Sequence, residues 1–269
     1  MSTEIDRISA TRRPAERAAG YHSWLDLTFI HWTVPAEMIT PLLPPGLTLD
    51  TWEGEAWVGL VPFYMANVRP WWSPAVPGVS YFCETNVRTY VHYQGRDPGV
   101  WFFSLEASNS IAVKAARWGW HLPYFRAQMS LVRHGDNVRY SSRRLWPEPT
   151  PAGCEIETEL GPLLGANDFN RSKPAGQAIP GTLEHFLVER YILYAQARDQ
   201  SLLSGRVYHT PYPVREARVS RCEQSLLPAA GIHPTTPPRH VAACDGVQVE
   251  VFPLKTGGVL DQMIRGEHD

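Results

Sequence analysis

Alternating apolar and polar side chains predict short β-strands along most of the chain. From Trp24 the segment LDLTFIHWTV places Leu25, Leu27 and Phe29 on one side of an extended backbone, a pattern typical of a half-buried strand. The same alternation, bounded by turn residues, recurs throughout the sequence. It predicts strands at residues 47–50, 56–65, 84–93, 100–107, 125–133, 138–144, 155–160, 205–209 and 247–254, while residues 190–195 fit a strand or a helix.

Helical periodicity is limited to a few short segments. The strongest covers residues 110–120, where Ser108 or Asn109 can cap the first turn and apolar residues recur on one face. That predicted apolar stripe consists of Ile111, Ala115 and Trp118, and can include Ala112 and Gly119. Shorter helices are expected at residues 35–40, 182–187 and 216–226. Long helices and coiled coils are not expected, because 24 prolines and 20 glycines interrupt the chain.

These elements indicate one β-rich domain with a short extension at each end. We expect residues 1–20 to form a flexible N-terminal arm, residues 21–256 a single domain, and residues 257–269 a C-terminal tail. Within the arm, residues 14–19 favour a helix. Strands and helices do not alternate, so a doubly wound parallel sheet is excluded. The prediction is an α+β fold of mainly antiparallel strands, as a barrel or sandwich with a few short flanking helices.

Charge and composition narrow the range of partners and compartments. Lysine and arginine total 25 against 27 acidic residues, a net charge of −2, which argues against nucleic acid as a partner. No stretch approaches the roughly 18–20 apolar residues of a spanning helix, and the polar first twenty residues do not resemble a secretory signal. Four scattered cysteines suit a reducing compartment. We expect a cytoplasmic protein that binds neither nucleic acid nor membrane.

The aromatic content is high, with ten tryptophans, eleven tyrosines and nine phenylalanines. Such side chains favour strands and the walls of concave ligand sites. Trp71 and Trp72 lie in the proline-rich segment 69–78, which is predicted to be a loop. This loop either folds onto the core of the domain or serves as a lid or a protein interface.

Motifs for nucleotides, metals and nucleophilic catalysis are not found in the sequence. It contains no G-x-G-x-x-G, Walker, H-E-x-x-H or G-x-S-x-G motif. We therefore predict no cofactor and no metal. Lysine is scarce, since Lys114, Lys173 and Lys255 are the only three. Lys114 lies beside the predicted apolar stripe of its helix, and we expect its side chain to be solvated.

Seven segments, taken together, resemble an uncharacterised bacterial family, domain of unknown function 2071. They are residues 24–32 (WLDLTFIHW), 42–63 (LLPPGLTLDTWEGEAWVGLVPF), 84–91 (ETNVRTYV), 99–117 (GVWFFSLEASNSIAVKAAR), 122–129 (LPYFRAQM), 186–195 (FLVERYILYA) and 246–254 (GVQVEVFPL). That family is similar in turn to the acetoacetate decarboxylase superfamily. This resemblance implies a cone-shaped antiparallel β-barrel with a central cavity.

The likeness to acetoacetate decarboxylases also argues against their reaction in this chain. SIAVKAARWGWHLPYF resembles the helix of those enzymes and the turn that follows it, although the helix-to-proline spacing differs by two residues. In the decarboxylases, the residue after that proline is the lysine that forms a Schiff base. Here Pro123 is followed by Tyr124, so decarboxylation through an imine is not expected.

The strand around residues 84–91 carries the main candidate site. Glu84 stands where the decarboxylases have a cavity glutamate. The polar residues Glu84, Asn86, Arg88 and Tyr90 alternate with a second set that includes two valines. If that second set faces the outer helices, the polar set lines the barrel. Unpaired buried charge is costly, so these groups either bind a ligand, pair with other strands or face water.

Three further residues are candidates with structural alternatives. Tyr124 can donate a proton or a hydrogen bond to a carbonyl, or it is a structural aromatic. Arg126 can bind a carboxylate through two nitrogens, or it forms a strand salt bridge. His209 can titrate near neutral pH, or it is a hydrogen-bonded structural histidine. Structural or solvated roles are expected for His31, Arg143, Arg144, Glu189 and Arg190.

Two functions fit these residues. In the first, an enzyme without a Schiff base acts on a small carbonyl or carboxylate compound in the barrel cavity by hydration, dehydration, proton transfer or cyclisation. Glu84 and Tyr124 are its catalytic candidates, and Asn86, Arg88, Arg126 and His209 its substrate-binding candidates. In the second, the protein binds or senses a small molecule without turnover. Formation of a homo-oligomer, which the resemblance allows, stays open.

Overall fold

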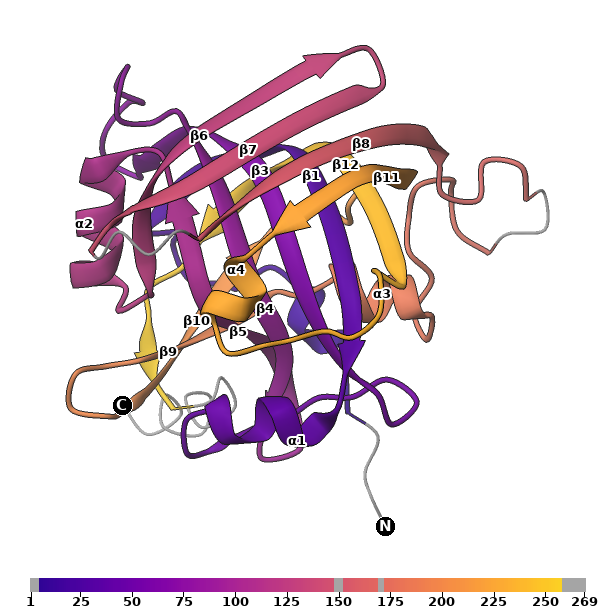
Figure 1. The fold of residues 1–269 in the computed structure, drawn as a ribbon. Helices are drawn as coiled ribbons and strands as arrows, with labels where there is room; N and C mark the ends of the chain where they lie inside the picture. Colours follow the sequence, from indigo (N-terminus) through magenta and orange to yellow (C-terminus); the bar gives the residue numbers. More distant parts are fainter. Residues whose placement is uncertain (1–4, 148–151, 169–171, 258–269) are drawn as a thin grey trace.

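The computed structural model describes residues 5–147, 152–168 and 172–257, and thirteen strands in these ranges belong to one sheet (Figure 1). The strands are β1 (Gly20–Val34), β2 (Leu47–Leu49), β3 (Ala56–Pro70), β4 (Phe82–Tyr93), β5 (Arg96–Ala107), β6 (Tyr124–His134), β7 (Asn137–Trp146), β8 (Gly153–Leu163), β9 (Ile192–Gln196), β10 (Leu202–Tyr208), β11 (Val214–Gln224), β12 (His240–Val251) and β13 (Lys255–Thr256). The α-helices are α1 (Ala36–Ile39), α2 (Ser110–Gly119), α3 (Leu183–Val188) and α4 (Leu226–Ala229), with 3₁₀ turns at Ser9–Thr11 and Thr40–Leu42.

The pairing of the strands closes on itself. The sheet runs β13-β10-β9-β5-β6-β7-β8-β11-β12-β1-β3-β4-β2, and two extra pairings join β4 to β5 and β10 to β12. As a result β1, β3, β4, β5, β9, β10 and β12 form a closed circuit, and β6, β7, β8 and β11 form a second layer that crosses in front of it (Figure 1). Most pairings are antiparallel, as expected, while β5 pairs in parallel with both β6 and β9.

Two apolar clusters occupy the two faces of the circuit strands. One contains Phe29, Tyr90 and Phe186. The other contains Val87 and Ile156 and lies between the circuit and the second layer, where α4 also packs. Burial of both faces explains why β4 is buried over most of its length. Because each strand turns alternate side chains to opposite faces, one face of β4 is left to the interior of the circuit.

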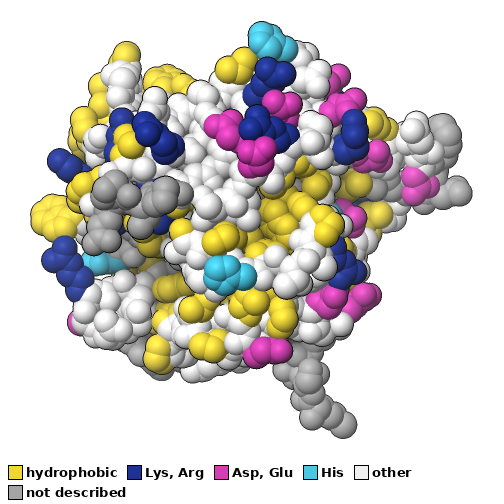
Figure 2. Space-filling view, viewed as in Figure 1, with side chains coloured by type: hydrophobic (Ala, Val, Ile, Leu, Met, Phe, Trp, Pro, Cys, Tyr) yellow, Lys and Arg dark blue, Asp and Glu magenta, His cyan; other side chains and the backbone are white. Residues whose placement is uncertain are grey.

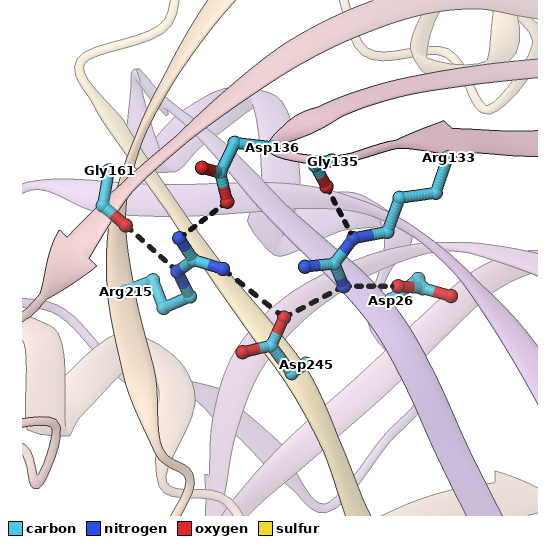
Figure 3. A network of polar contacts seen from close by, with 7 residues as sticks. All are labelled: Asp26, Arg133, Gly135, Asp136, Gly161, Arg215 and Asp245. Carbon is cyan, nitrogen blue, oxygen red and sulfur yellow. Dashed lines mark hydrogen bonds and ion pairs between the residues drawn. The ribbon is translucent and has the colours of Figure 1, made fainter.

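A network of charged side chains ties the β6–β7 turn to β1, β11 and β12 (Figure 3). Arg133 lies 2.7 Å from both Asp26 and Asp245. Arg215 lies 2.8 Å from Asp136 and 3.4 Å from Asp245. Asp245 therefore joins the two guanidinium groups, and the network fixes the hairpin across the circuit strands.

The predicted strands are largely confirmed, with two corrections. Residues 216–224 belong to β11 and not to a helix, because they pair with β8 and β12 in the sheet. The turn expected at residues 95–99 is shorter, since β5 already begins at Arg96. Gln94 and Gly95 both have positive φ angles, of 50° and 78°, the geometry that joins antiparallel strands through a two-residue turn.

The helix predicted at residues 110–120 is confirmed as α2, but its buried face is different. Asn109 caps α2, because its side chain accepts hydrogen bonds from the main-chain amides of Ile111 and Ala112 at 2.9 and 3.0 Å. The predicted apolar stripe faces outward, with Ile111 60% and Trp118 79% exposed. Val113 is the buried residue of this helix. The stripe was wrong because helical periodicity identifies a face without showing which face the sheet covers.

The described part of the predicted N-terminal arm packs against the sheet. Arg7 forms an ion pair with buried Asp50, and Arg13 forms one with Glu250 of β12 at 2.6 Å. Residues 14–19 contain no helix. The helix favoured at residues 14–19 is therefore wrong, while the flexibility of the arm stays a prediction and nearly all of the predicted C-terminal tail lies outside the described residues.

The outer face of the second layer is strongly charged. Figure 2 shows basic and acidic side chains gathered over the front strands, above an area of hydrophobic side chains. Arg218 and Glu159 form one such pair at 2.7 Å. Within the described ranges, no helix has the length and apolar character needed to cross a bilayer.

Candidate functional site

A cavity of about 550 Å³ lies inside the closed circuit of strands. Its walls come from β1, β3, β4, β5, β9 and β10, and α2 contributes to one side. Most of the lining side chains are apolar, and Val61, Phe63, Met65, Phe82 and Leu105 are among them. A cavity of this size and composition is typical of a site for a small organic molecule.

β4 supplies a row of polar side chains to this cavity. Glu84, Asn86 and Arg88 all line it. Between them, Thr85 hydrogen bonds to a tyrosine of the second layer and Val87 lies in the outer apolar cluster. Of the four residues expected to share the inward face of this strand, Glu84, Asn86 and Arg88 line the cavity, and Tyr90 is not among its described lining residues.

Tyr124 joins this row from a different strand. It is the first residue of β6 and lies opposite Leu105 of β5, while Glu84 lies opposite Ala107 of the same strand. This arrangement lets the Tyr124 hydroxyl donate a hydrogen bond to Oε2 of Glu84 at 2.8 Å. The two catalytic candidates, 40 positions apart in the sequence, are thus in direct contact.

Burial controls the protonation of this pair. It raises the pKa of Glu84 from 4.5 to about 8, the hydrogen bond from Tyr124 works in the opposite direction, and the charge of Glu106 adds to the rise. The pKa of Tyr124 is also raised well above its usual 10 by burial and by the neighbouring Glu84. At neutral pH Glu84 is therefore mostly protonated and Tyr124 is a hydrogen-bond donor.

Asn86 and Arg88 each have an unused polar atom. Arg88 is 8% exposed and donates from Nη2 to the main-chain oxygen of Leu187 at 3.0 Å. Its Nε, like Oδ1 of Asn86, is buried and finds no hydrogen-bond partner among the described residues. Buried polar atoms are normally satisfied, so these two atoms are exceptions within the polar row.

Tyr90, the fourth member of the predicted polar row, packs beneath the cavity and supports Arg88. Its hydroxyl donates to the same Leu187 oxygen at 2.8 Å and lies 2.7 Å from Nε2 of His31. Gly59 makes room for this packing, since a Cβ there would lie 2.9 Å from the His31 ring and 3.5 Å from Arg88. His31 is fully buried, in line with its expected structural role.

Arg126 and His209 are not among the described residues that line the cavity. Arg126 is half-buried and donates from Nε to Ser110 at 2.9 Å. His209 is stacked on Tyr191 with ring centres 4.5 Å apart, and its Nδ1 lies 2.7 Å from the Thr210 carbonyl oxygen. Burial lowers the pKa of His209 to about 4. The histidine is therefore neutral at physiological pH, as a structural histidine would be.

None of the three lysines of the chain lines the cavity. Lys114 is exposed on α2, as predicted, and Lys173 is exposed as well. Lys255 forms an ion pair with Glu16 at 3.0 Å. A Schiff base with a ligand in this cavity would need a lysine within it. In the described ranges, histidine, cysteine, aspartate and glutamate side chains form no group of three or more suited to a metal ion.

Two buried arginines outside the polar row have carboxylate partners. Arg190 also lines the cavity, and it forms an ion pair with Asp50 at 3.0 Å, in line with its expected structural role. Arg144 was expected to be solvated, and this was wrong. It is 7% exposed, pairs with Glu106 and lies 3.6 Å from the centre of the Phe125 ring, because β6 and β7 fold back over β5.

Sequence reasoning expected aromatic walls for a ligand site but did not identify which tryptophans form them. Trp24 and Trp120 line the cavity, but no local pattern separates them from the other eight tryptophans. In the segment 69–78, Trp72 is 70% exposed, and Arg17 lies 3.3 Å above the Trp71 ring. These tryptophans do not fold into the core, so a lid or protein interface stays a prediction.

The amino-acid sequence matches a family model and is similar to one bacterial protein. The model of domain of unknown function 2071, described as an uncharacterized conserved protein, matches residues 21–248. The uncharacterized protein YqjF of Bacillus subtilis strain 168 is 34% identical over 210 residues, which cover 78% of this chain and 81% of YqjF.

Structural comparison finds decarboxylase-like proteins at low sequence identity. Acetoacetate decarboxylase from Legionella pneumophila has a TM-score of 0.59 and 13% identity, covering 92% of this chain and 93% of that one. An acetoacetate decarboxylase-like enzyme from Sphingomonas wittichii RW1 has a TM-score of 0.58 and 11% identity, covering 90% and 94%. The enduracididine biosynthesis enzyme MppR complexed with pyruvate has a TM-score of 0.57 and 9% identity, covering 90% and 91%. At these identities the likeness establishes a shared fold.

Proposed function

We propose that this chain, which belongs to the family domain of unknown function 2071, is an enzyme that moves protons on a small carbonyl or carboxylate compound. In this proposal the closed circuit of strands is the cone-shaped barrel of the decarboxylase-like fold, and its cavity holds the substrate. The observation that carries the proposal is the contact between Glu84 and Tyr124 inside a mainly apolar cavity.

Glu84 is the acid and base of the proposed reaction. A carboxyl group with a pKa of about 8 is a stronger base when ionised than an ordinary glutamate, and it still ionises in part at neutral pH. Its carboxylate removes a proton from the carbon next to the substrate carbonyl. The same group, now protonated, returns the proton to carbon or to oxygen. Tyr124 orients the carboxyl through its hydrogen bond and stabilises the ionised form.

Asn86 and Arg88 bind the polar part of the substrate. The Asn86 amide lies two residues from Glu84 on the same face of β4, where it can hold the carbonyl or the enolate oxygen as charge develops. The guanidinium of Arg88, with its unpaired Nε, binds the anionic group. No step requires a lysine, in keeping with the positions of all three lysines outside the cavity.

Exchange of carbon-bound hydrogen tests the proposal. Pyruvate, the compound bound to MppR, is incubated with the protein in D₂O, and loss of its methyl signal is followed by NMR. We expect exchange in the wild type, and at least a hundredfold slower exchange in Glu84→Gln, which has no basic carboxylate. Glu223→Gln is a matched control on the surface of β11. Equal exchange rates for Glu84→Gln and the wild type would rule out the assigned role of Glu84.

A second candidate function is binding of such a compound without turnover. It is favoured by the apolar aromatic walls of the cavity and by the lack of a lysine in it. Saturable binding of pyruvate by calorimetry, with no exchange above the buffer rate, would identify a carrier or sensor. The four cysteines are free thiols, which supports the proposed cytoplasmic location for either function.

A further inference from the structure

We infer that the substrate is an elongated oxo acid, whose anionic group binds at Arg88 and whose apolar tail leaves the cavity beneath α2. This inference rests on the proposed function and adds the shape and polarity of the substrate. It follows from three observations: the order of side chains along β4, the unpaired charge at one end of the cavity, and the small residues at the other.

The polar row of β4 has a direction. Arg88, Glu84 and Phe82 all line the cavity from the same strand. With a rise of about 3.3 Å per residue, the Cα atoms of Arg88 and Glu84 are separated by about 13 Å. That separation leaves room for a carboxylate, a carbonyl and the adjacent carbon in series between the guanidinium and the Glu84 carboxyl. Phe82 lies beyond Glu84, opposite Met65 of β3, so the lining becomes apolar there.

The Arg88 end of the cavity calls for an anion. The guanidinium is buried, forms no ion pair among the described residues, and has a hydrogen bond to a main-chain oxygen and one unpaired nitrogen. Two aromatic rings, Phe29 and Tyr90, have their centres 5.7 Å from it. A buried charge without a counter-ion is unfavourable, and a bound carboxylate would neutralise it.

The opposite end of the cavity is open, and mostly small side chains line it. α2 lines it with Ala112, Ala115, Ala116 and Gly119. A Cβ at Gly119 would meet no atom within 4 Å, and Ile111 of the same lining is 60% exposed. The cavity therefore reaches solvent beneath α2. Its volume of about 550 Å³ lies in the range that holds ligands much larger than a three- or four-carbon acid.

Chain length is the first test of this inference. Binding of straight-chain 2-oxo acids, from pyruvate to 2-oxodecanoate, is measured by calorimetry on the wild-type protein. We expect Kd to fall by about fourfold for each added methylene group that the cavity buries. Equal affinities along the series, or weaker binding of the longer acids, would overturn the apolar tail.

The carboxylate is tested with the matching ligands that lack it. Alkan-2-ones of the same chain lengths should bind at least tenfold more weakly than the oxo acids, because they leave the Arg88 charge unpaired. Equal binding of ketones and oxo acids would overturn the anion site. This comparison uses only the wild-type protein, so it does not depend on whether an Arg88 variant folds.

A pair of variants on α2 locates the tail. Ala116→Phe fills the lining beneath the helix, whereas Lys114→Phe places the same ring on the exposed side of the same helix. We expect Ala116→Phe to abolish the gain in affinity from pyruvate to 2-oxodecanoate, and Lys114→Phe to leave that gain unchanged. An unchanged chain-length series in a folded Ala116→Phe protein would overturn the exit beneath α2.

The exchange assay separates this inference from the proposed function. Exchange of pyruvate that depends on Glu84, together with a flat chain-length series, would overturn the elongated substrate alone. A steep chain-length series without exchange would overturn the catalytic role and leave the ligand class in place.

Discussion

The hydroxyl of Tyr124 donates a hydrogen bond to Oε2 of Glu84 at 2.8 Å, inside a cavity whose walls are mainly apolar. The contact joins the first residue of β6 to the middle of the sheet, and it depends on the parallel pairing of β5 with β6. It places a carboxyl group of raised pKa beside a donor that cannot itself ionise at neutral pH. The proposed reaction depends on this relationship.

The raised pKa of Glu84 predicts a loss of stability with rising pH. In the unfolded chain the carboxyl ionises near pH 4.5, whereas in the folded protein it keeps its proton until about pH 8. Between these values the unfolded state releases its proton first, so the free energy of unfolding falls as the pH rises. Glu84→Gln removes this contribution. Relative to the variant, the wild type should lose on the order of a few kcal/mol between pH 5 and pH 8.

Urea unfolding of both proteins at the two pH values measures this difference. Other buried acids contribute equally to both proteins, so they cancel in the comparison. If the difference in the free energy of unfolding between wild type and variant stays constant from pH 5 to pH 8, Glu84 ionises with its ordinary pKa.

Tyr124→Phe should raise the pKa of Glu84 further, because the hydrogen bond that it removes favours the ionised carboxylate. A shift of roughly one unit is expected for one such bond, and ¹³C NMR of labelled glutamate can follow it. Tyr140→Phe is the matched control, since the Tyr140 hydroxyl donates to the main-chain oxygen of Glu84 at 2.7 Å and not to its carboxyl group. If both variants shift the Glu84 titration equally, the contact with Tyr124 is not its cause.

Arg144→Met should destabilise the fold strongly. The change leaves Glu106, which is fully buried, without its ionic partner, and an uncompensated buried charge costs about 3–5 kcal/mol. The double variant Glu106→Gln/Arg144→Met removes both charges and should be more stable than Arg144→Met alone. Denaturant unfolding of the wild type, Glu106→Gln, Arg144→Met and the double variant gives the coupling free energy, and additive effects would contradict a buried pair.

Gly59→Ala and Gly119→Ala should change the stability of the fold differently, although the substitution is the same. At Gly59 the new Cβ would lie 2.9 Å from the ring of buried His31, so we expect a loss of about 1–3 kcal/mol. At Gly119 the Cβ meets open space, so the change should be neutral or stabilise α2 by up to about 1 kcal/mol. Thermal unfolding distinguishes the two. Similar melting temperatures for both variants would show that His31 can move aside.

Much of the fold and the centre of the site could be predicted from the amino-acid sequence. The period-2 pattern of residues 84–93 predicted that Glu84, Asn86 and Arg88 share a face, and all three line the cavity. Asn109 was a predicted cap of the helix at residues 110–120, and it caps α2. These features depend on neighbours in the sequence, which fix side-chain direction within one element.

Other features could not be predicted, because they depend on which elements meet. Ile111 and Trp118 of the predicted apolar stripe of α2 are largely exposed, and residues 216–226, expected to be helical, belong mostly to a strand of the second layer. Arg126 and His209 have the chemistry of substrate-binding residues, yet both lie outside the cavity lining of the described residues. Arg144 of β7 is buried beside Glu106 of β5, which lies 38 positions earlier in the chain.

The order of residues along the chain was enough to specify the alternation of the strands, the cap of α2 and the polar row on β4, because backbone geometry alone turns every second side chain to the same face. Long-range packing determined that Tyr124 contacts Glu84, that the charge of Arg88 has no counter-ion among the described residues, and that α2 leaves the cavity open to solvent. The pKa of Glu84 depends on burial and on its neighbours Tyr124 and Glu106, which are far from it in the sequence. These residues come together, and water is excluded from around Glu84, only when the circuit of strands has closed.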